Sequence, residues 1–172
     1  MHIRSVFILL ALLFVLQAAD ADAYCWRRQR RRLVRINPPT LLDPVPFGYS
    51  QIVVDTRNAV AHVAGQNAIN QTGSLVGETF AEQLEQTLRN VELALEAVEA
   101  DINDILKSIL ITVDLDPSTA EDILAASLMN AGGPAPPGIV FSSDSLLEPG
   151  VLVEIQVDVA VPESFVRRLV CS

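Results

Sequence analysis

Apolar and polar residues recur along this chain with two different periods. Alternation at every second position is typical of a strand with one buried face, and apolar residues at steps of three and four indicate an amphipathic helix. The clearest strand is the last, where valine and isoleucine alternate with Glu154, Gln156 and Asp158. Together the two patterns predict strands at residues 50–55, 59–64, 108–115, 138–142 and 151–161, and helices at 80–100 and 117–130.

Both predicted helices carry recognisable start signals. Thr79 and Glu82 form a capping box, in which each side chain accepts a backbone N–H that has no partner within the helix. Asp116 followed by Pro117 places a carboxylate at the N-cap and proline at the first helical position. Between the first two strands, residues 56–58 predict a tight hairpin turn.

The order of elements is β-β-α-β-α-β-β, which predicts a single α+β domain. Two helices cannot cover both faces of the sheet, so we expect both of them on one face. The other face still carries apolar side chains, and burial between subunits is the simplest way to cover it. The pattern therefore predicts a self-associating protein.

The first 23 residues have the layout of a secretory signal peptide. Arg4 precedes an unbroken apolar run at residues 6–16, and Ala21-Asp22-Ala23 forms an A-x-A cleavage site. The run is too short to cross a bilayer, which takes about 20 apolar residues. We therefore expect a secreted, extracellular protein with no membrane contact once the signal is removed.

Composition divides the rest of the chain into three parts. Residues 24–43 form a basic, proline-containing leader, residues 44–163 the folded domain, and residues 164–172 a C-terminal tail. Prolines around the start of the domain favour extended chain over helix.

The arginine cluster Arg27–Arg35 leaves three interpretations open. Arg28, Arg30 and Arg31 stand in the R-x-R-R form that secretory convertases cut, which indicates a processing site. Alternatively, the cluster is an arm that binds a polyanion of an extracellular matrix, or a solvated, disordered leader.

Two features fit an oxidising, extracellular setting. Asn70-Gln71-Thr72 is an N-glycosylation sequon in a polar stretch, which indicates a surface loop of a glycoprotein. Cys25 and Cys171 are the only cysteines. They are candidates for a disulfide with each other or between neighbouring subunits.

The acidic charge of the chain limits the classes of partner that it can bind. A formal net charge of −9 argues against nucleic acid, since phosphate binding requires a basic face. We expect no metal site, because neither cysteine has a ligand-type neighbour. His62 is interpreted as an ordinary strand residue, since no serine, cysteine or acid stands with it in a catalytic triad.

Six short stretches fall in the order and spacing of one known family: Gly48–Gln51, Val63–Gln66, Thr72–Val76, Gln83–Asn90, Asp104–Lys107 and Val153–Ile155. Over residues 47–161 the chain resembles the RidA/YjgF (RutC) family. The resemblance implies a chorismate-mutase-like, ferredoxin-like fold assembled as a homotrimer, with ligand pockets between subunits. Best-known members hydrolyse reactive 2-imino acids to 2-oxo acids without a cofactor, and some have been described as ribonucleases.

The resemblance also implies pocket residues. Tyr49 matches the pocket tyrosine, Gly65 a glycine whose backbone lines the site, and Glu154 the acid that positions the attacking water. The arginine that holds the substrate carboxylate as a bidentate pair has no counterpart at residues 135–140, and Asp122 replaces the usual asparagine. The implied pocket therefore lacks the side chain that would hold the carboxylate of an anionic substrate.

These observations predict a secreted, trimeric RidA-like protein without deaminase chemistry. It would be a binding or structural component of an extracellular fluid or matrix, including the matrix of a calcified tissue. The alternative is a cofactor-independent imine or enamine hydrolase with a different substrate anchor. A ribonuclease role is disfavoured by the acidic charge.

Overall fold

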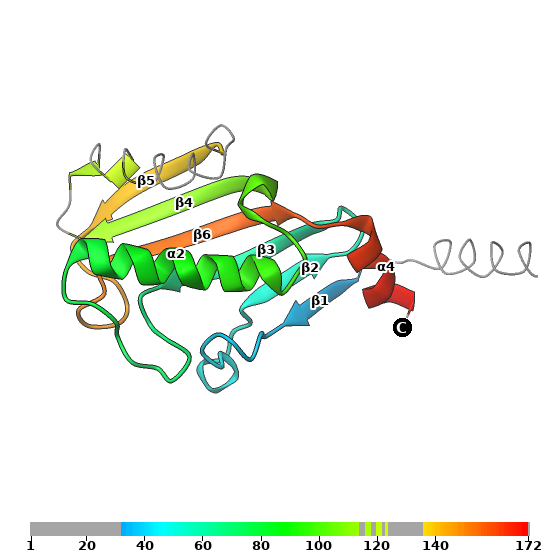
Figure 1. Cartoon of the computed structure of the whole chain (residues 1–172), viewed down its shortest axis with the longest axis horizontal. Coiled ribbons are helices and arrows are strands. Elements are labelled where there is room, and N and C mark those ends of the chain that lie inside the picture. The colour runs from blue at the N-terminus through cyan, green and yellow to red at the C-terminus, as the bar shows by residue number, and fades with distance from the viewer. Residues whose placement is uncertain (1–31, 114–115, 118–119, 122, 124–135, 172) are drawn as a thin grey trace, which may run out of the picture.

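A mixed sheet of six strands forms the body of the molecule, and one long helix lies across one of its faces (Figure 1). The computed structural model describes residues 32–113, 116–117, 120–121, 123 and 136–171. The strands are β1 (Leu33–Ile36), β2 (Ile52–Asp55), β3 (Val60–Asn67), β4 (Ile105–Val113), β5 (Gly138–Ser143) and β6 (Val153–Ala160), and the helices are α2 (Phe80–Glu96) and α4 (Glu163–Cys171), with 3-10 turns at Val45–Phe47 and Ile102–Asp104.

The strands lie in the order β1-β2-β3-β6-β4-β5. All neighbouring pairs are antiparallel except β4 and β5, which are parallel. A parallel pair needs a crossover connection, and the segment between β4 and β5 was predicted as a helix. Pro117, Ala120, Glu121 and Ile123 are helical, and the rest of that predicted helix lies outside the described residues. The α+β fold class is confirmed.

The helix α2 begins where its capping box predicts. The Thr79 hydroxyl accepts the Glu82 N–H at 3.4 Å, and the Glu82 carboxylate accepts the N–H groups of Thr79 and Glu78 at 3.0 and 2.9 Å. These backbone hydrogen bonds lower the pKa of Glu82. The helix packs over β3 and β6 through Leu84, Val91 and Leu95.

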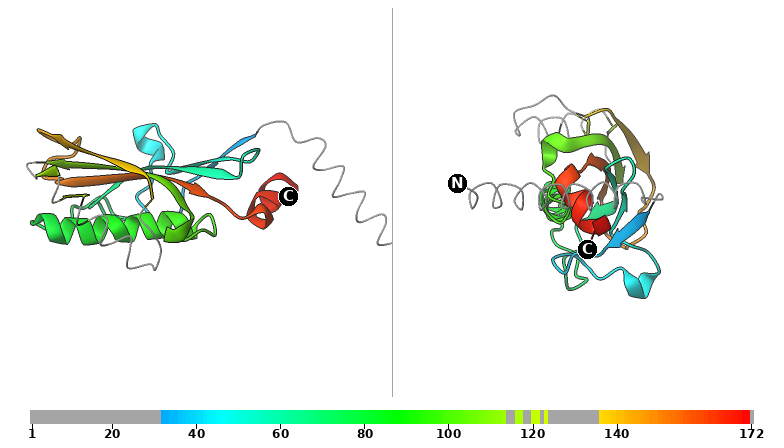
Figure 2. Two further views of the ribbon diagram at one scale, coloured as in Figure 1. Left: turned by 90° about the horizontal axis from the view of Figure 1, so that it is seen from above. Right: turned by 90° about the vertical axis from the view of Figure 1, so that its right-hand side faces the viewer.

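The core lies between α2 and one face of the sheet, as the edge-on view in Figure 2 shows. The odd-numbered residues of β6 from Val153 to Val159 are fully buried under the helix. Glu154, Gln156 and Asp158 lie on the opposite face, called the open face below. A register slip of one residue would exchange the two sets, so the pairing of β6 is well specified.

The structure contains two elements that the sequence did not predict. β1 lies within the predicted leader and pairs with β2 from Leu33↔Asp55 to Ile36↔Ile52. The predicted tail is helix α4, whose Phe165 and Val166 are buried against the core. A disordered leader is therefore wrong for residues 33–36, because backbone pairing with β2 orders this short edge strand, in which Leu33 and Arg35 stay exposed. Burial of the Phe165 and Val166 side chains orders the predicted tail.

Candidate functional site

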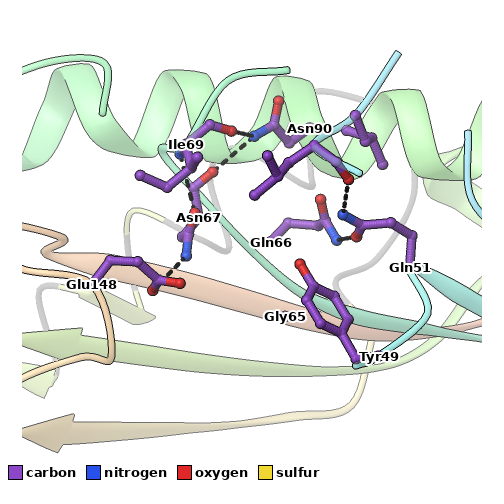
Figure 3. Close-up of a pocket in the computed structure, with 10 residues that line it drawn as sticks. Tyr49, Gln51, Gly65, Gln66, Asn67, Ile69, Asn90 and Glu148 are labelled. Atoms are coloured by element: carbon purple, nitrogen blue, oxygen red, sulfur yellow. Dashed lines mark hydrogen bonds between the residues drawn. The ribbon is translucent and has the colours of Figure 1, made fainter. Parts of the chain in front are cut away.

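A small cavity of about 30 Å³ lies where the chain before β2, the end of β3 and the helix α2 meet (Figure 3). Tyr49 and Gln51 approach it from the segment leading into β2, and Glu148 from the loop before β6. The lining residues that the structure describes are Leu41, Leu42, Tyr49, Gln51, Gly65, Gln66, Asn67, Ile69, Asn90 and Glu148.

Buried carboxamides tie the walls of the cavity together. The Gln66 Nε2 donates to Gln51 Oε1 at 2.9 Å, and the Gln51 Nε2 donates to the Leu42 carbonyl at 2.8 Å. From α2, the Asn90 Nδ2 donates to the carbonyls of Asn67 and Ile69, each at 2.8 Å. Because these amides link separate elements, the cavity has a fixed shape.

The loop that carries Glu148 is also held by the helix. The Gln83 Nε2 donates to the Gly150 carbonyl at 2.8 Å, and its Oε1 accepts the Leu152 N–H at 2.8 Å. Gln83 is only 1% exposed. A buried side chain with both ends bonded is costly to move, so the position of Glu148 beside the cavity is set by α2.

Gly65 and Glu154 meet across the strands β3 and β6. The register of this pair of strands shifts between Val63 and Gln66, which places Gly65 in an irregular stretch. A Cβ atom on Gly65 would lie 2.1 Å from the Glu154 Oε1. Since real atoms cannot approach so closely, the glycine leaves the space in which this carboxylate lies.

The site is electrostatically negative. Burial, followed by the charge of Glu148, raises the pKa of Glu154, and a hydrogen bond from Asn67 partly offsets this. Burial and the Glu148 charge also raise the pKa of Tyr49. The Asn67 Nδ2 donates to the Glu148 Oε2 at 3.3 Å, so one amide serves both carboxylates.

Among the described residues that line the cavity, none is an arginine, lysine or histidine. The ion pairs found in the described part of the chain lie elsewhere: His62 with Asp158, Arg167 with Glu163, and Arg168 with Glu99. Arg89 borders a separate surface hollow on α2. Arg57 is exposed in the hairpin between β2 and β3.

The segment where the resemblance places an arginine starts β5, away from the cavity. Gly138 pairs with Ser108 and Glu154 with Ile111. The two positions are thus three residues apart along β4, or about 10 Å along the strand direction. A Cβ atom on Gly138 would lie 2.5 Å from the Ser108 Oγ and 3.0 Å from the Ser108 carbonyl oxygen, so a side chain there would require the serine hydroxyl to turn away.

The structure places Tyr49 and Gly65 in the lining of one cavity, with Glu154 directly behind Gly65. Their roles stay predictions. Asp122 lies outside the described residues. Sequence reasoning missed Glu148 and the carboxamides of Gln51, Gln66, Asn67 and Asn90 as lining residues.

Other predicted positions fall in several places. The Asn70 Oδ1 accepts the N–H groups of Thr72 and Ser74, each at 3.0 Å, in a turn on the surface. Cys171 takes part in a disulfide. Cys25 lies outside the described residues, so pairing between the two stays a prediction. The processing-site arginines Arg28, Arg30 and Arg31 also lie outside the described residues.

Two kinds of feature are absent from the described residues. No group of three or more histidine, cysteine, aspartate or glutamate residues is placed to hold a metal ion. Within the same residues, every helix is too short or too polar to cross a membrane.

Comparisons with known proteins complete the description of the site. A family model described as Endoribonuclease L-PSP matches residues 43–161. Among solved structures, the Rid-family protein YyfA from Yersinia pestis superposes with a TM-score of 0.67 at 24% identity, covering 76% of this chain and 100% of its own. YyfB from the same organism is 30% identical with a TM-score of 0.54, covering 75% and 98%. Rv2704 from Mycobacterium tuberculosis, of the YjgF/YER057c/UK114 family, is 25% identical with a TM-score of 0.56, covering 77% and 100%. A comparison with curated proteins gave no match.

Proposed function

We propose a function from one premise: this chain belongs to the endoribonuclease L-PSP family, the family of the Rid and YjgF proteins. Within that family we propose that it is a secreted, non-catalytic member. It acts as a binding or structural component of an extracellular fluid or matrix, including that of a calcified tissue.

One observation carries the non-catalytic proposal: among the described residues, the cavity has one carboxylate in its lining and a second beside Gly65, and no cation lines it. A 2-imino acid presents its own carboxylate, which Glu148 and Glu154 would repel. Loss of a buried charge-assisted pair costs about 2–5 kcal/mol. That corresponds to a loss of binding of roughly 30-fold to several thousand-fold.

The open face of the sheet supports self-association. Ile139 and Phe141 on β5 are 49% and 46% exposed. They lie beside Ile109 and Ile111 of β4 on the same face. A contiguous apolar area on an otherwise acidic protein is a typical interaction surface, and a closed homo-oligomer covers it with another copy of itself. We propose a homotrimer, in accordance with the family.

The non-catalytic proposal is tested with an imine generated in place. An amino-acid oxidase acting on 2-aminobutanoate supplies 2-iminobutanoate, and release of the oxo acid is followed with and without purified protein. We expect the rate to equal the rate in buffer. Faster release that is lost in both Glu154→Gln and Tyr49→Phe would instead establish a hydrolase.

One observation keeps that hydrolase as the second candidate. Tyr49 and Glu154 lie at the same cavity, and the raised pKa of Glu154 brings this carboxyl closer to the range in which a proton acceptor works at neutral pH. An uncharged imine or enamine would not be repelled by Glu148. Testing such a substrate in the same assay distinguishes a protein that has lost all hydrolase activity from one that only holds its substrate in a different way.

Export is tested directly. The full chain is expressed in a secretory cell line, and the N-terminus of the protein in the medium is sequenced. We expect Tyr24 as the first residue if the leader is kept, or a residue just after Arg31 if a convertase cuts it. Retention of residues 1–23 inside the cell would contradict secretion.

A further inference from the structure

A row of charged side chains crosses the open face of the sheet at right angles to its strands. The strand register links five residues in turn, one on each strand: Arg35 on β1, Val53 on β2, His62 on β3, Asp158 on β6 and Lys107 on β4. Directly paired residues lie on the same face of a sheet, and Asp158 lies on the open face, so all five do. Arg35, His62 and Lys107 are called the basic row below.

The basic row is opposed by little negative charge. The one carboxylate among the five residues belongs to Asp158, whose Oδ1 lies 2.7 Å from the His62 Nδ1. Arg35 and Lys107 are exposed, and neither takes part in an ion pair within the described part of the chain. Two exposed cations without a carboxylate partner are therefore available to an anion from outside the protein.

On the open face, the surroundings of the basic row are also poor in acids. In the next row toward the hairpin, Asp55 is 4% exposed, and its carboxylate accepts a backbone N–H of the hairpin at 3.0 Å. In the next row on the other side, the register pairs Gln156 with Ile109, which are both uncharged. Glu154 follows only two residues beyond Gln156 along β6, or about 13 Å from Asp158. A local excess of positive charge therefore exists on a chain whose formal net charge is −9.

Further basic residues lie at the same end of the sheet. Arg32 directly precedes β1, and its carbonyl accepts the Thr56 N–H at 3.2 Å, next to the exposed Arg57 of the hairpin (Figure 1). The arginines of residues 27–31 are joined to the domain through Arg32. Of the described arginines and lysines that form no ion pair, Arg89 alone lies elsewhere, on α2. The unpaired positive charge of the described chain is thus concentrated at one end.

The spacing of the basic row fits a linear polymer better than a small anion. Neighbouring strands lie about 4.8 Å apart, so His62 is separated from Arg35 and from Lys107 by two strands each, or about 10 Å. A compact anion reaches one of these side chains, whereas an extended polyanion that crosses the strands reaches all three. Nucleic acid uses aromatic side chains to stack its bases, and none of the five residues is aromatic. A sulfated polysaccharide needs no such platform.

We propose that the basic row binds a sulfated polysaccharide that lies across the strands on the open face. Its sulfate groups accept charge-assisted hydrogen bonds from the guanidinium of Arg35 and the ammonium of Lys107. The row extends from β4 to the edge strand β1, away from Ile139 and Phe141 on β5, where we propose contact with another copy. The proposal rests on the proposed function, since it requires an exported protein, and it names the class of partner for that function.

The test is calorimetric titration of the secreted protein with heparin in about 0.15 M sodium chloride. Desulfated heparin, which keeps the sugar chain and its carboxylates, and polyuridylic acid are the comparison ligands. We expect each of them to bind about tenfold more weakly than heparin, or weaker still. No binding of heparin, or equal binding of the desulfated polymer, would overturn the proposal. Equal or tighter binding of polyuridylic acid would identify a nucleic-acid surface and overturn it as well.

Matched variants locate the binding. Arg35→Gln and Lys107→Gln should each weaken heparin binding about threefold, and the two together about tenfold, as expected for exposed ion pairs. The double variant should also show a shallower dependence of affinity on salt concentration, because fewer counterions are released on binding. Arg89→Gln removes an exposed charge from α2 and should change neither quantity. Equal effects of Arg35→Gln and Arg89→Gln would place the polymer elsewhere.

Two further variants separate the basic row from its neighbours. Replacement of every arginine at residues 27–31 by glutamine should leave heparin binding measurable, and complete loss would assign the polymer to the leader instead. Phe141→Asp, which adds a charge to the proposed contact between copies, should bind heparin as the wild type does. Binding by Phe141→Asp alone would show that another copy covers the row, which overturns the proposal for the assembled protein.

The imine assay keeps the two proposals distinguishable. Faster imine hydrolysis contradicts the proposed non-catalytic function, whatever the result with heparin. Absent heparin binding together with an unchanged rate of hydrolysis contradicts only the class of partner.

Discussion

The two faces of the sheet differ in how far their apolar side chains are covered. On the helix face, α2 covers the sheet, and residues such as Ile155 and Val157 are 2% exposed. On the open face, apolar side chains of β4 and β5 stay partly exposed, and on β3 and β6 the His62 Nδ1 lies 2.7 Å from the Asp158 Oδ1. The helix face is completed by this chain alone. The open face keeps exposed apolar residues on β4 and β5 and polar side chains on β3 and β6, and in an interface such an apolar area forms the buried centre with the polar groups around it.

The largest effect should come from weakening the helix face. Leu95 on α2 is 1% exposed, and Leu95→Ala removes buried methyl groups and leaves a cavity. We expect the free energy of unfolding to fall by about 2–5 kcal/mol, measured by urea denaturation at a fixed protein concentration. Glu92→Ala, on the exposed side of the same helix, should change it by less than about 0.5 kcal/mol. Similar losses in both variants would show that α2 does not close this face.

A smaller loss should follow from removing the helix cap. Thr79→Ala leaves the Glu82 N–H without the hydroxyl that accepts it at 3.4 Å, and it removes half of the capping box. We expect a loss of about 1 kcal/mol, seen by the same denaturation. Thr79→Ser keeps the hydroxyl and should recover most of the stability. If serine fails to recover it, the loss comes from the methyl group and the cap is unimportant.

The helix face was also the more predictable of the two. Strict alternation in β6 and the capping box of α2 are local patterns, and both elements were found close to their predicted bounds. β1 was missed because it has only four residues and follows an arginine run. The start of β4 was placed at 108 and lies at 105, because the irregularity between Ile105 and Lys107 interrupts the alternation.

The candidate site was predictable only in part, for a physical reason. Tyr49, Gly65 and Glu154 were named because short sequence stretches resemble a known family. Glu148 belongs to no such stretch. Its place depends on two hydrogen bonds, one that the Gln83 Nε2 donates to the Gly150 carbonyl and one that the Leu152 N–H donates to the Gln83 Oε1. These partners are separated by 67 and 69 positions in the sequence. Contacts of that range leave no periodic signal in the sequence.

Glu154 lies on the open face of β6, and the opposite face of this strand is part of the core. Because the pKa of Glu154 is raised in the folded protein, mainly by burial, the folded state keeps this proton to a higher pH than the unfolded state does. Stability should therefore fall as pH rises from the ordinary glutamate value of 4.5 through the raised value.

The variant Glu154→Gln removes this pH dependence. We expect it to be more stable than the wild type at neutral pH and to lose that advantage below the ordinary glutamate pKa, in denaturation curves measured from pH 4 to pH 8. Glu163→Gln, an exposed carboxylate on α4, is the control and should show a flat difference. An advantage of Glu154→Gln that does not depend on pH would contradict the cause given for the raised pKa.

The smallest effect on the folded subunit should come from the open face, although the effect on assembly should be complete. Phe141 is 46% exposed on the edge strand β5, so Phe141→Asp leaves no cavity in the core and should change the stability of the isolated subunit by no more than about 0.5 kcal/mol. A charge there opposes burial against another copy, so sedimentation should show a single subunit for the variant and the proposed trimer for the wild type. Leu147→Asp, at a loop residue 90% exposed, tests whether any added charge has this effect.

Because bound subunits stabilise one another by mass action, the melting temperature of the wild type should rise with protein concentration, whereas that of Phe141→Asp should not. A wild type that sediments as a monomer would show that this face is used for something other than self-association, and the apolar residues on β4 and β5 would then need a different partner.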